Sequence, residues 1–186
     1  MNRFQGFETP LAGVWRIERS LIADARGFLG RLFCAEELSA YGWIWPIAQI
    51  NHALTEKSGT VRGMHFQQPP HAEAKLVSCV KGSVWDVVID LRRDSLTYMR
   101  WTAHVISAIN QCALLIPPGC AHGFQSLEDR SELLYCHSHP YVADADAALN
   151  PQDPTLAIPW PQTITLISDK DRQRPLLNKT FQGLII

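Results

Sequence analysis

Short apolar runs separated by turn residues fill the middle of this 186-residue chain and limit the folds that it can adopt. Runs of strand length at this spacing favour an antiparallel sandwich or barrel over alternating strands and helices. We therefore expect an all-β fold, either a closed barrel or a jelly roll. The predicted strands cover Ala74–Val80, Ser83–Leu91, Tyr98–Ile106, Ala113–Ile116 and Glu132–His137.

The segments that join and flank these runs complete the prediction. Lys81-Gly82 separates two of the runs and is typical of a hairpin turn. Ala35–Tyr41 is the one segment that predicts a helix. The proline-rich tail from Asn150 predicts irregular structure that wraps the sheet. We find no repeat, low-complexity tract or Gly/Ser linker, so we expect a single domain over residues 1–186.

The composition narrows the classes of partner. With 46% hydrophobic residues, 19% charged residues and a net charge of -1, the chain has no bulk basic surface for nucleic acid, although a few local Arg and Lys residues could bind a nucleotide-sized anion. Charged residues between Arg3 and Arg19 argue against a signal peptide, and the longest apolar stretches are too short to span a bilayer. Five scattered cysteines without a Cys-x-x-Cys pair predict free thiols in a reducing compartment. We expect a cytoplasmic protein with no membrane partner and no nucleic-acid partner.

Four polar residues interrupt otherwise apolar strand patterns, and they carry the chemical information. They are His65, Lys75, His122 and Tyr135. In Val61–Gln67, the alternation along a strand puts His65 and Gln67 on one face, and Gly63 on the same face leaves access open. His122 is expected in a turn that leads out of an apolar strand. Because inward positions of one sheet converge on one cavity, these residues together predict a site.

Each of these side chains also has a structural alternative. A single His or Tyr in a strand is more often a hydrogen-bonded core or rim residue, and a single Lys more often lies on a sheet edge with its ammonium in water. The hypothesis of a site therefore rests on their occurrence in one sheet. The other histidines show no comparable pattern and are expected at structural or surface positions. They are His52, His71, His104, His137 and His139.

A series of short strings, in a fixed order and spacing, relates these residues to a known family. The strings are Arg62–Gln67 (RGMHFQ), Lys75–Val77, Gly82–Arg92, Ile116–Phe124 (IPPGCAHGF), Glu132–Tyr135, Asn150–Pro154 and Ile167–Asp171. In this combination they resemble the core of the dTDP-4-dehydrorhamnose 3,5-epimerase family, from about Asp24 to Asp171. The resemblance implies a cupin fold, which is a double-stranded β-helix or jelly roll with short helical ornaments. It also implies a homodimer in which the N-terminal segment of each subunit reaches into the partner's site.

The resemblance implies a reaction as well. Family members invert carbon centres next to the C4 ketone of a 4-keto-6-deoxy nucleotide sugar, without metal or coenzyme, for deoxysugar or surface-polysaccharide biosynthesis such as the dTDP-rhamnose pathway. His65 resembles the general base that removes the proton alpha to the ketone, and Asp171 resembles the carboxylate that orients and charges it. Lys75 resembles the cation beside the developing enolate oxygen, and Tyr135 resembles the acid that returns a proton from the opposite face.

The resemblance assigns substrate binding to a second set of residues. Arg26 matches a position near the nucleotide phosphates, and Phe28 lies in the segment that completes the partner's pocket. Arg62 and His122 match site-lining positions. The full set is Arg26, Phe28, Gln49, Asn51, Arg62, Gln67, His122 and Tyr141.

The chemistry of such a reaction agrees with these residue types. A proton beside a ketone is weakly acidic, so its removal requires a base with a pKa near the working pH and a stabilised charge on the oxygen. A His beside a carboxylate supplies the base, typically worth ~10²–10⁴-fold in rate. A fixed cation stabilises the oxygen, where a single donor is worth about 3 kcal/mol in related sites. Inversion needs an acid on the other face, and tyrosine keeps its proton at neutral pH.

We predict neither a metal nor any other cofactor. Cupin barrels often hold a metal on a His-x-His…His set, but Gln67 stands two residues after His65 and no Glu follows His65 within a few residues. His65 and His122 without a third strong ligand make a poor site for a divalent cation.

The chain departs from the family pattern in regions expected to contact the nucleotide or the neighbouring subunit. The departures are Leu29-Gly30-Arg31, Ile50, Pro140-Tyr141 and Leu149–Gln152. The chemical residues are intact, so the nucleotide, the sugar and the number of centres inverted stay open. The alternatives are an epimerase that inverts a single centre or uses a CDP-linked or otherwise linked sugar, a non-catalytic sugar-binding cupin, and a metal-dependent cupin oxygenase or isomerase. The number of metal ligands disfavours the last of these.

Overall fold

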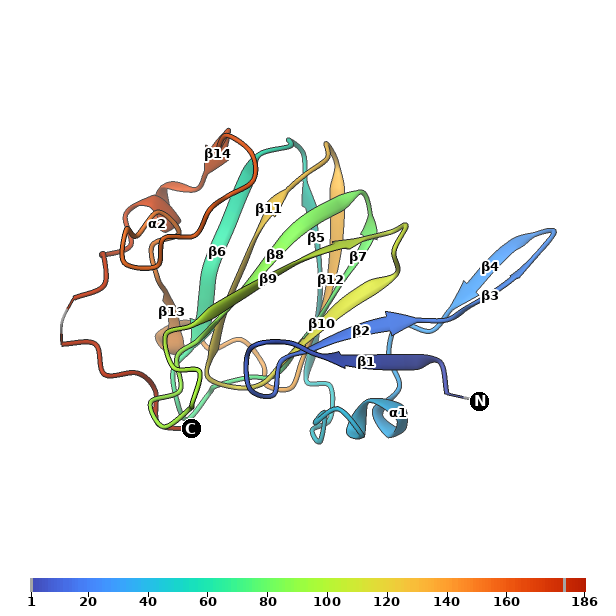
Figure 1. Ribbon diagram of the computed structural model, residues 1–186, viewed down its shortest axis with the longest axis horizontal. Coiled ribbons are helices and arrows are strands. Elements are labelled where there is room, and N and C mark those ends of the chain that lie inside the picture. Colours follow the sequence, from blue (N-terminus) through green and yellow to red (C-terminus); the bar gives the residue numbers. More distant parts are fainter. Residues whose placement is uncertain (1, 179) are drawn as a thin grey trace.

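Two sheets face each other in the computed structural model, which describes residues 2–178 and 180–186 (Figure 1). The first sheet has the strand order β1-β2-β10-β7-β12-β5, and the second has the order β13-β6-β11-β8-β9 with a short β14 paired to β6. The first consists of β1 (Phe4–Glu8), β2 (Trp15–Arg19), β5 (Gln49–Thr55), β7 (Lys75–Lys81), β10 (Cys112–Ile116) and β12 (Ser131–His137). The second consists of β6 (Thr60–Gln67), β8 (Ser83–Asp90), β9 (Trp101–Ser107), β11 (Cys120–Ser126), β13 (Asp146–Ala148) and β14 (Leu166–Ile167).

From β5 onward the chain passes repeatedly from one sheet to the other, because β5, β7, β10 and β12 lie in the first sheet and the strands between them lie in the second. Strands that alternate in this way between two antiparallel sheets form a jelly roll. The prediction of an all-β jelly roll is therefore confirmed, and the solved structures described below share it.

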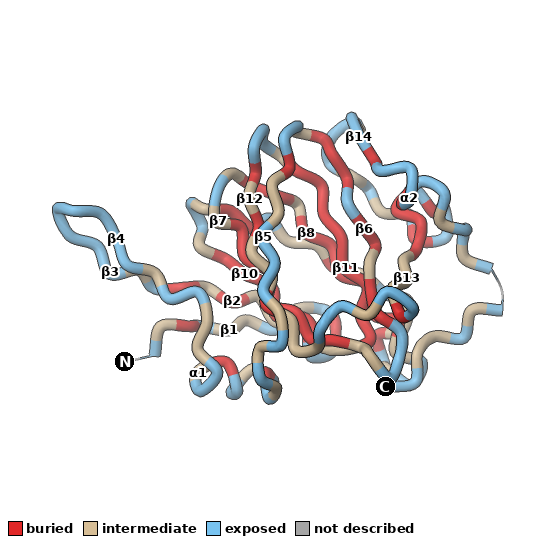
Figure 2. Tube along the Cα trace, turned by 180° about the vertical axis from the view of Figure 1, so that it is seen from behind, coloured by how far each residue is buried: buried red, intermediate tan, exposed pale blue. Residues whose placement is uncertain are grey.

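The space between the sheets is filled by apolar side chains from both. Val77 and Leu133 of the first sheet pack with Val88 and Phe124 of the second. Burying a side chain of this size contributes about 1.5–3 kcal/mol, so this cluster keeps the two sheets closed. Tyr135 packs against the same cluster and marks the point where the core ends. Figure 2 shows the buried residues concentrated in these facing strands.

Three elements lie outside the sandwich and matter for function. A separate hairpin of β3 (Leu21–Asp24) and β4 (Gly27–Gly30) projects away from the sheets (Figure 1). Helix α1 (Ala35–Ser39) packs Leu38 against the outer face of the first sheet. A 3₁₀ turn, η1 (Ala143–Ala145), precedes β13.

The predicted strands agree with β7, β8, β9, β10 and β12, with ends that differ by up to three residues. The largest difference is in β9, which begins at Trp101 rather than at Tyr98. The main-chain N–H groups of Tyr98 and Arg100 donate to Ser95 and Thr97 in turns, so that segment cannot join the sheet.

The hairpin predicted at Lys81-Gly82 is wrong. The turn joins β7 to β8, but these strands lie in different sheets, so it carries the chain across the sandwich. Gly82 has a φ of 71°, and a Cβ at this position would lie 2.6 Å from Ser131 Oγ. The turn residues mark the end of a strand correctly, but they do not determine which strand becomes the partner of the next one.

The predictions for the helix and the tail need smaller corrections. The helix predicted over Ala35–Tyr41 forms but ends at Ser39. The tail from Asn150 is irregular for most of its length, as predicted, but it also contains β14 and a short helix α2 (Asp169–Arg172). Within the described part of the chain, no helix has both the length and the apolar character needed to cross a membrane.

Candidate active site

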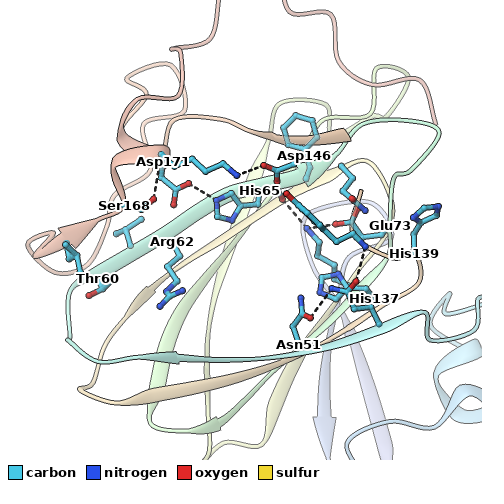
Figure 3. A pocket seen from close by; sticks show the side chains of 18 residues that line it. Asn51, Thr60, Arg62, His65, Glu73, His137, His139, Asp146, Ser168 and Asp171 are labelled. Atoms are coloured by element: carbon cyan, nitrogen blue, oxygen red, sulfur yellow. Dashed lines mark hydrogen bonds and ion pairs between the residues drawn. The ribbon is translucent and has the colours of Figure 1, made fainter. Parts of the chain in front are cut away.

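A cavity lies between the two sheets, beside the core. It has two adjoining lobes of about 540 Å³ and 480 Å³. The same five side chains, Asn51, Arg62, His65, Lys75 and His137, line both lobes, so the lobes form one site. Cavities of this size accommodate organic ligands of nucleotide scale. Figure 3 shows the side chains of the larger lobe.

His65 and Asp171 form a hydrogen-bonded pair on one wall of this cavity. His65 Nε2 lies 2.7 Å from Asp171 Oδ1, and the side chain of His65 is 43% exposed whereas that of Asp171 is only 6% exposed. With Nε2 donating to the carboxylate, Nδ1 is the nitrogen left to accept a proton. Burial works against ionisation of Asp171, but the hydrogen bond and the charge of His65 outweigh it and hold the pKa of this carboxyl below its usual value.

The C-terminal tail positions Asp171 from far away in the sequence. Ser168 caps α2, where its hydroxyl oxygen accepts the main-chain N–H of Asp171 at 3.1 Å. The buried side chain of Asn150 donates to the carbonyl oxygens of Arg172 and Arg174, at 3.2 Å and 2.9 Å. Asn150, the first residue of one of the family strings, therefore helps to hold the segment that carries Asp171 in place.

An irregularity in β6 turns Arg62 and His65 into the same cavity. Residues three apart in a regular strand point to opposite faces, but the register of β6 against β11 shifts between these two residues. Gly63 lies within the irregular stretch, and a Cβ there would meet the Cα of Gly123 at 2.6 Å. The expectation that Gly63 leaves access open is wrong, because this glycine allows two backbones to approach each other.

Lys75 is buried at the start of β7, with 5% of its surface exposed. Its Nζ donates to the carbonyl oxygen of His65 at 3.1 Å and forms an ion pair with Glu73 Oε1 at 3.0 Å. The alternative of a sheet-edge lysine with its ammonium in water is wrong. The cation is instead held against the main chain of the residue predicted as the base.

Tyr135 approaches the cavity from the other sheet. It lies in β12, whereas His65 lies in β6. The ring of Tyr135 packs edge-on against His122, with 5.9 Å between centroids, and stacks on His137 at 6.0 Å. Burial, followed by the charge of Asp86, raises the pKa of Tyr135 well above its usual value, although the charge of Arg62 opposes this. Tyr135 therefore keeps its proton at neutral pH.

His122 lies inside β11, directly opposite His65 of β6, so its prediction as part of a turn is wrong. Its Nε2 lies 2.9 Å and 2.8 Å from the two carboxylate oxygens of Asp86 in β8. Both side chains are buried. Asp86 was not among the predicted site residues, although an acidic residue inside the apolar run Ser83–Leu91 could have indicated a buried partner.

Three other residues of the cavity wall were missed. His137 and His139, expected at structural or surface positions, both line the larger lobe, as does Glu73. Burial, followed by the charge of Lys75, lowers the pKa of His137 to about 4. The two histidines follow Tyr135 at intervals of two residues, and this strand alternation was the available signal.

The predicted binding residues of the sandwich also face the cavity. Gln49, Asn51, Gln67 and Tyr141 line the larger lobe, and His122 and Arg62 line the smaller one. The amide of Gln49 donates to Asn51 Oδ1 and accepts the main-chain N–H of Tyr141, each at 2.9 Å. The amide of Gln67 donates to the carbonyl oxygen of Pro140 at 3.2 Å, so it holds the same segment in place.

Arg26 and Phe28 do not reach this cavity within one chain. Phe28 lies in β4 of the projecting hairpin, and Arg26 lies in the turn between β3 and β4. The guanidinium of Arg26 pairs with Asp24 at 2.5 Å, and the Arg26 side chain is 89% exposed. Phe28 is 65% exposed. Within residues 2–178 and 180–186, including the cavity, no three His, Cys, Asp or Glu side chains are grouped so that they could hold a metal ion.

Comparison with known proteins relates this chain to a family of epimerases. A family model described as dTDP-4-dehydrorhamnose 3,5-epimerase matches residues 8–179. A dTDP-4-dehydrorhamnose 3,5-epimerase from Streptomyces griseus is 38% identical over 165 residues, which is 88% of this chain and 82% of the relative. A dTDP-4-dehydro-6-deoxyglucose 3-epimerase from Streptomyces bikiniensis is 36% identical over 169 residues, 90% of this chain and 86% of the relative.

Solved structures agree with the sequence comparison. The crystal structure of dTDP-4-dehydrorhamnose 3,5-epimerase from Bacillus anthracis, with TDP and PPi bound, superposes with a TM-score of 0.90 at 38% identity. The match covers 94% of this chain and 99% of that one.

Proposed function

This chain belongs to the dTDP-4-dehydrorhamnose 3,5-epimerase family, and we propose that it inverts one or both carbon centres beside the C4 ketone of a dTDP-linked 4-keto-6-deoxy sugar. It is an epimerase, and therefore an isomerase, of nucleotide-sugar metabolism. The observation that carries the proposed mechanism is the convergence of the His65–Asp171 pair, Lys75 and Tyr135 on one cavity from two facing sheets.

The first step is removal of the proton on C3 or C5. Nδ1 of His65 takes this proton, and the negative charge of Asp171 stabilises the imidazolium that forms. The electron pair of the broken C–H bond moves into the ring and places negative charge on the C4 oxygen. The buried Lys75 ammonium stabilises this enolate oxygen, and its charge acts strongly because water is largely excluded around it.

The second step returns a proton from the opposite side of the sugar. Tyr135 donates its phenolic proton to the same carbon, the C–H bond forms with inverted configuration, and the charge leaves the C4 oxygen. His65 and Tyr135 stand on different sheets, which supports their work on opposite faces of a ring bound between them. His65 then loses its extra proton to solvent and Tyr135 regains one, so the enzyme returns to its starting state.

Dimerisation completes the site in this proposal. The β3–β4 hairpin exposes Phe28 and Leu29, at 65% and 70%, on a projecting two-stranded ribbon (Figure 1). An isolated two-stranded ribbon with exposed apolar side chains is only marginally stable in water. We therefore propose that the hairpin packs against a partner subunit. There Phe28 would cover the partner's cavity, and Arg26 would approach the nucleotide phosphates.

We also propose a cytoplasmic location. All five cysteines are free thiols in the structure, and a reducing compartment keeps thiols in that state.

The proposed reaction can be tested by exchange with solvent deuterium. The purified protein is incubated in D₂O with dTDP-4-dehydro-6-deoxyglucose, and the sugar is followed by mass spectrometry and proton NMR. We expect deuterium at C3, at C5 or at both, together with an inverted product. Exchange at two carbons identifies a 3,5-epimerase, and exchange at one identifies a single-centre epimerase. A CDP-linked sugar is run in parallel to test nucleotide preference, and binding without exchange of either sugar would leave only a sugar-binding role.

A further inference from the structure

We propose that Glu73 is a positioning residue of this reaction, which holds the Lys75 ammonium charged and fixed in direction towards the C4 oxygen of the substrate. The inference rests on the proposed function, because it concerns the cation that stabilises the enolate. Glu73 does not itself contact the reacting carbon in this proposal. It acts through Lys75.

The contacts of the Lys75 ammonium define the role. An ammonium has three N–H donors, and two of them are directed to the carbonyl oxygen of His65, at 3.1 Å, and to Glu73 Oε1, at 3.0 Å. These two bonds leave a third donor whose direction is set by the other two. Both side chains line the larger lobe, so the third donor is available to an oxygen of a bound sugar.

Glu73 supplies the negative charge that Lys75 requires in this position. The side chains of Lys75 and Glu73 are only 7% and 6% exposed, and an ammonium removed from water in this way is unfavourable without a counter-ion. In the described part of the chain, Glu73 is the acidic side chain that lies within ion-pair distance of Lys75.

The other groups around Lys75 do not replace this charge. From β12, Tyr135 keeps its proton, and His137 lies directly across from Lys75 in the strand register. His137 stays neutral near pH 7, because burial and the charge of Lys75 lower its pKa to about 4. From β6 and β11, His65 and His122 line the smaller lobe with Lys75, and each is paired with its own aspartate.

The second carboxylate oxygen of Glu73 supports a role for the charge rather than for a hydrogen bond. Glu73 Oε2 is buried and has no hydrogen-bond partner among the described residues. A buried acceptor without a partner is destabilising, and a neutral amide could also accept a hydrogen bond from Lys75, although without supplying a charge. Retaining a carboxylate here therefore lowers the stability of the fold. The need to keep a cation in the catalytic cavity explains why the carboxylate is present.

The matched variant is Glu73→Gln, which keeps the size and the Oε1 acceptor and removes the charge. We expect kcat to fall by about tenfold or more at pH 7, part of the effect of losing one stabilising donor, with KM changed by less than about threefold. We also expect activity to decline further between pH 7 and pH 9, because an ammonium without its counter-ion loses its proton more readily. Glu73→Asp keeps the charge but moves it, so it should lower kcat while retaining the wild-type pH profile.

Two comparisons separate this role from a structural one. Glu56→Gln removes one carboxylate from an exposed pair with Arg130, away from the cavity, and should leave activity and pH profile unchanged. In a Lys75→Gln background, Glu73→Gln should cause no further loss, because residues that act as a unit are not additive. Circular dichroism and thermal unfolding establish whether each variant is folded. If Glu73→Gln does not fold, the kcat and pH profile of Glu73→Asp test the inference instead.

The outcomes are distinct. Any of three results would overturn this inference alone. They are a wild-type kcat and pH profile in folded Glu73→Gln, an unchanged kcat in Glu73→Asp, and an equal loss of activity on Glu73→Gln with Lys75 present or replaced. If the wild-type protein neither exchanges nor inverts any 4-keto nucleotide sugar, the proposed function fails and this inference fails with it.

Discussion

Replacing Tyr135 with phenylalanine separates the two proton transfers. In the proposed mechanism His65 removes the proton alone, and Tyr135 acts only afterwards from the other sheet. Tyr135→Phe should therefore still allow His65 to take the proton and to return it to the same face. The variant would incorporate deuterium from solvent while it forms little inverted product.

The structure provides the expected magnitudes. The ring of Tyr135 packs on the core cluster and between His122 and His137, and phenylalanine keeps that ring, so we expect a change in the free energy of unfolding of less than about 1 kcal/mol. An unperturbed tyrosine is about 0.1% ionised at pH 7, and burial raises the pKa of Tyr135 further, so the whole population is available as an acid. Loss of a general acid costs ~10²–10⁴-fold in rate. We expect inversion to fall by that factor and exchange to stay within about tenfold of wild type.

Both rates can be read from one incubation in D₂O, with mass spectrometry for deuterium and NMR for configuration. Tyr98→Phe is the matched control, because the Tyr98 hydroxyl donates to the carbonyl oxygen of Phe181 outside the cavity. His65→Asn should abolish exchange and inversion together. Inversion at the wild-type rate in Tyr135→Phe, or exchange at the wild-type rate in His65→Asn, would refute the assignment.

Three further predictions test other parts of the site. Asp171→Asn should give rates of exchange and inversion between those of wild type and His65→Asn, because a neutral amide stabilises the imidazolium of His65 less well but leaves the base in place. Activity at or below that of His65→Asn in a folded protein would contradict this. Because the pKa of His137 is lowered to about 4 in the folded state, the unfolded state binds more protons below about pH 6.5, and stability is lost as the pH falls. Denaturant unfolding should show His137→Gln losing up to about 2 kcal/mol less than wild type between pH 7 and pH 5, and equal losses would show that His137 does not contribute. Arg26→Ala should raise KM for the dTDP-sugar with little change in kcat; a fully active monomer at micromolar concentration would argue against a shared site.

The fold could be predicted to the level of its class, and the reason lies in particular segments. The central apolar runs encode strands because each has strand length and ends in turn residues. Pairing is a different matter. Lys81-Gly82 has the composition of a hairpin turn, yet β7 pairs with β10 and β12 while β8 pairs with β9 and β11. That choice depends on which faces are buried across the whole sandwich, and no local string contains it.

The chemical residues could be predicted better than their partners. His65, Lys75 and Tyr135 are polar residues within apolar patterns, and the family strings assigned Asp171 to His65. Glu73 lies outside any strand pattern and therefore gave no signal. The bulge in β6 was also invisible, because simple alternation places Arg62 and His65 on opposite faces.

Two histidines of the second sheet, each paired with an aspartate, show why the structure is needed to identify the base. His65 and His122 stand directly opposite each other on β6 and β11, and each contacts an aspartate at hydrogen-bond distance. A general base has to reach the proton that it removes. The side chain of His65 is 43% exposed to the cavity, whereas that of His122 is 6% exposed and lies within 2.9 Å of both oxygens of Asp86. His122 is therefore better placed to support the ring of Tyr135, against which it packs. The difference between the two histidines is one of access, and access is decided by which strand borders the cavity.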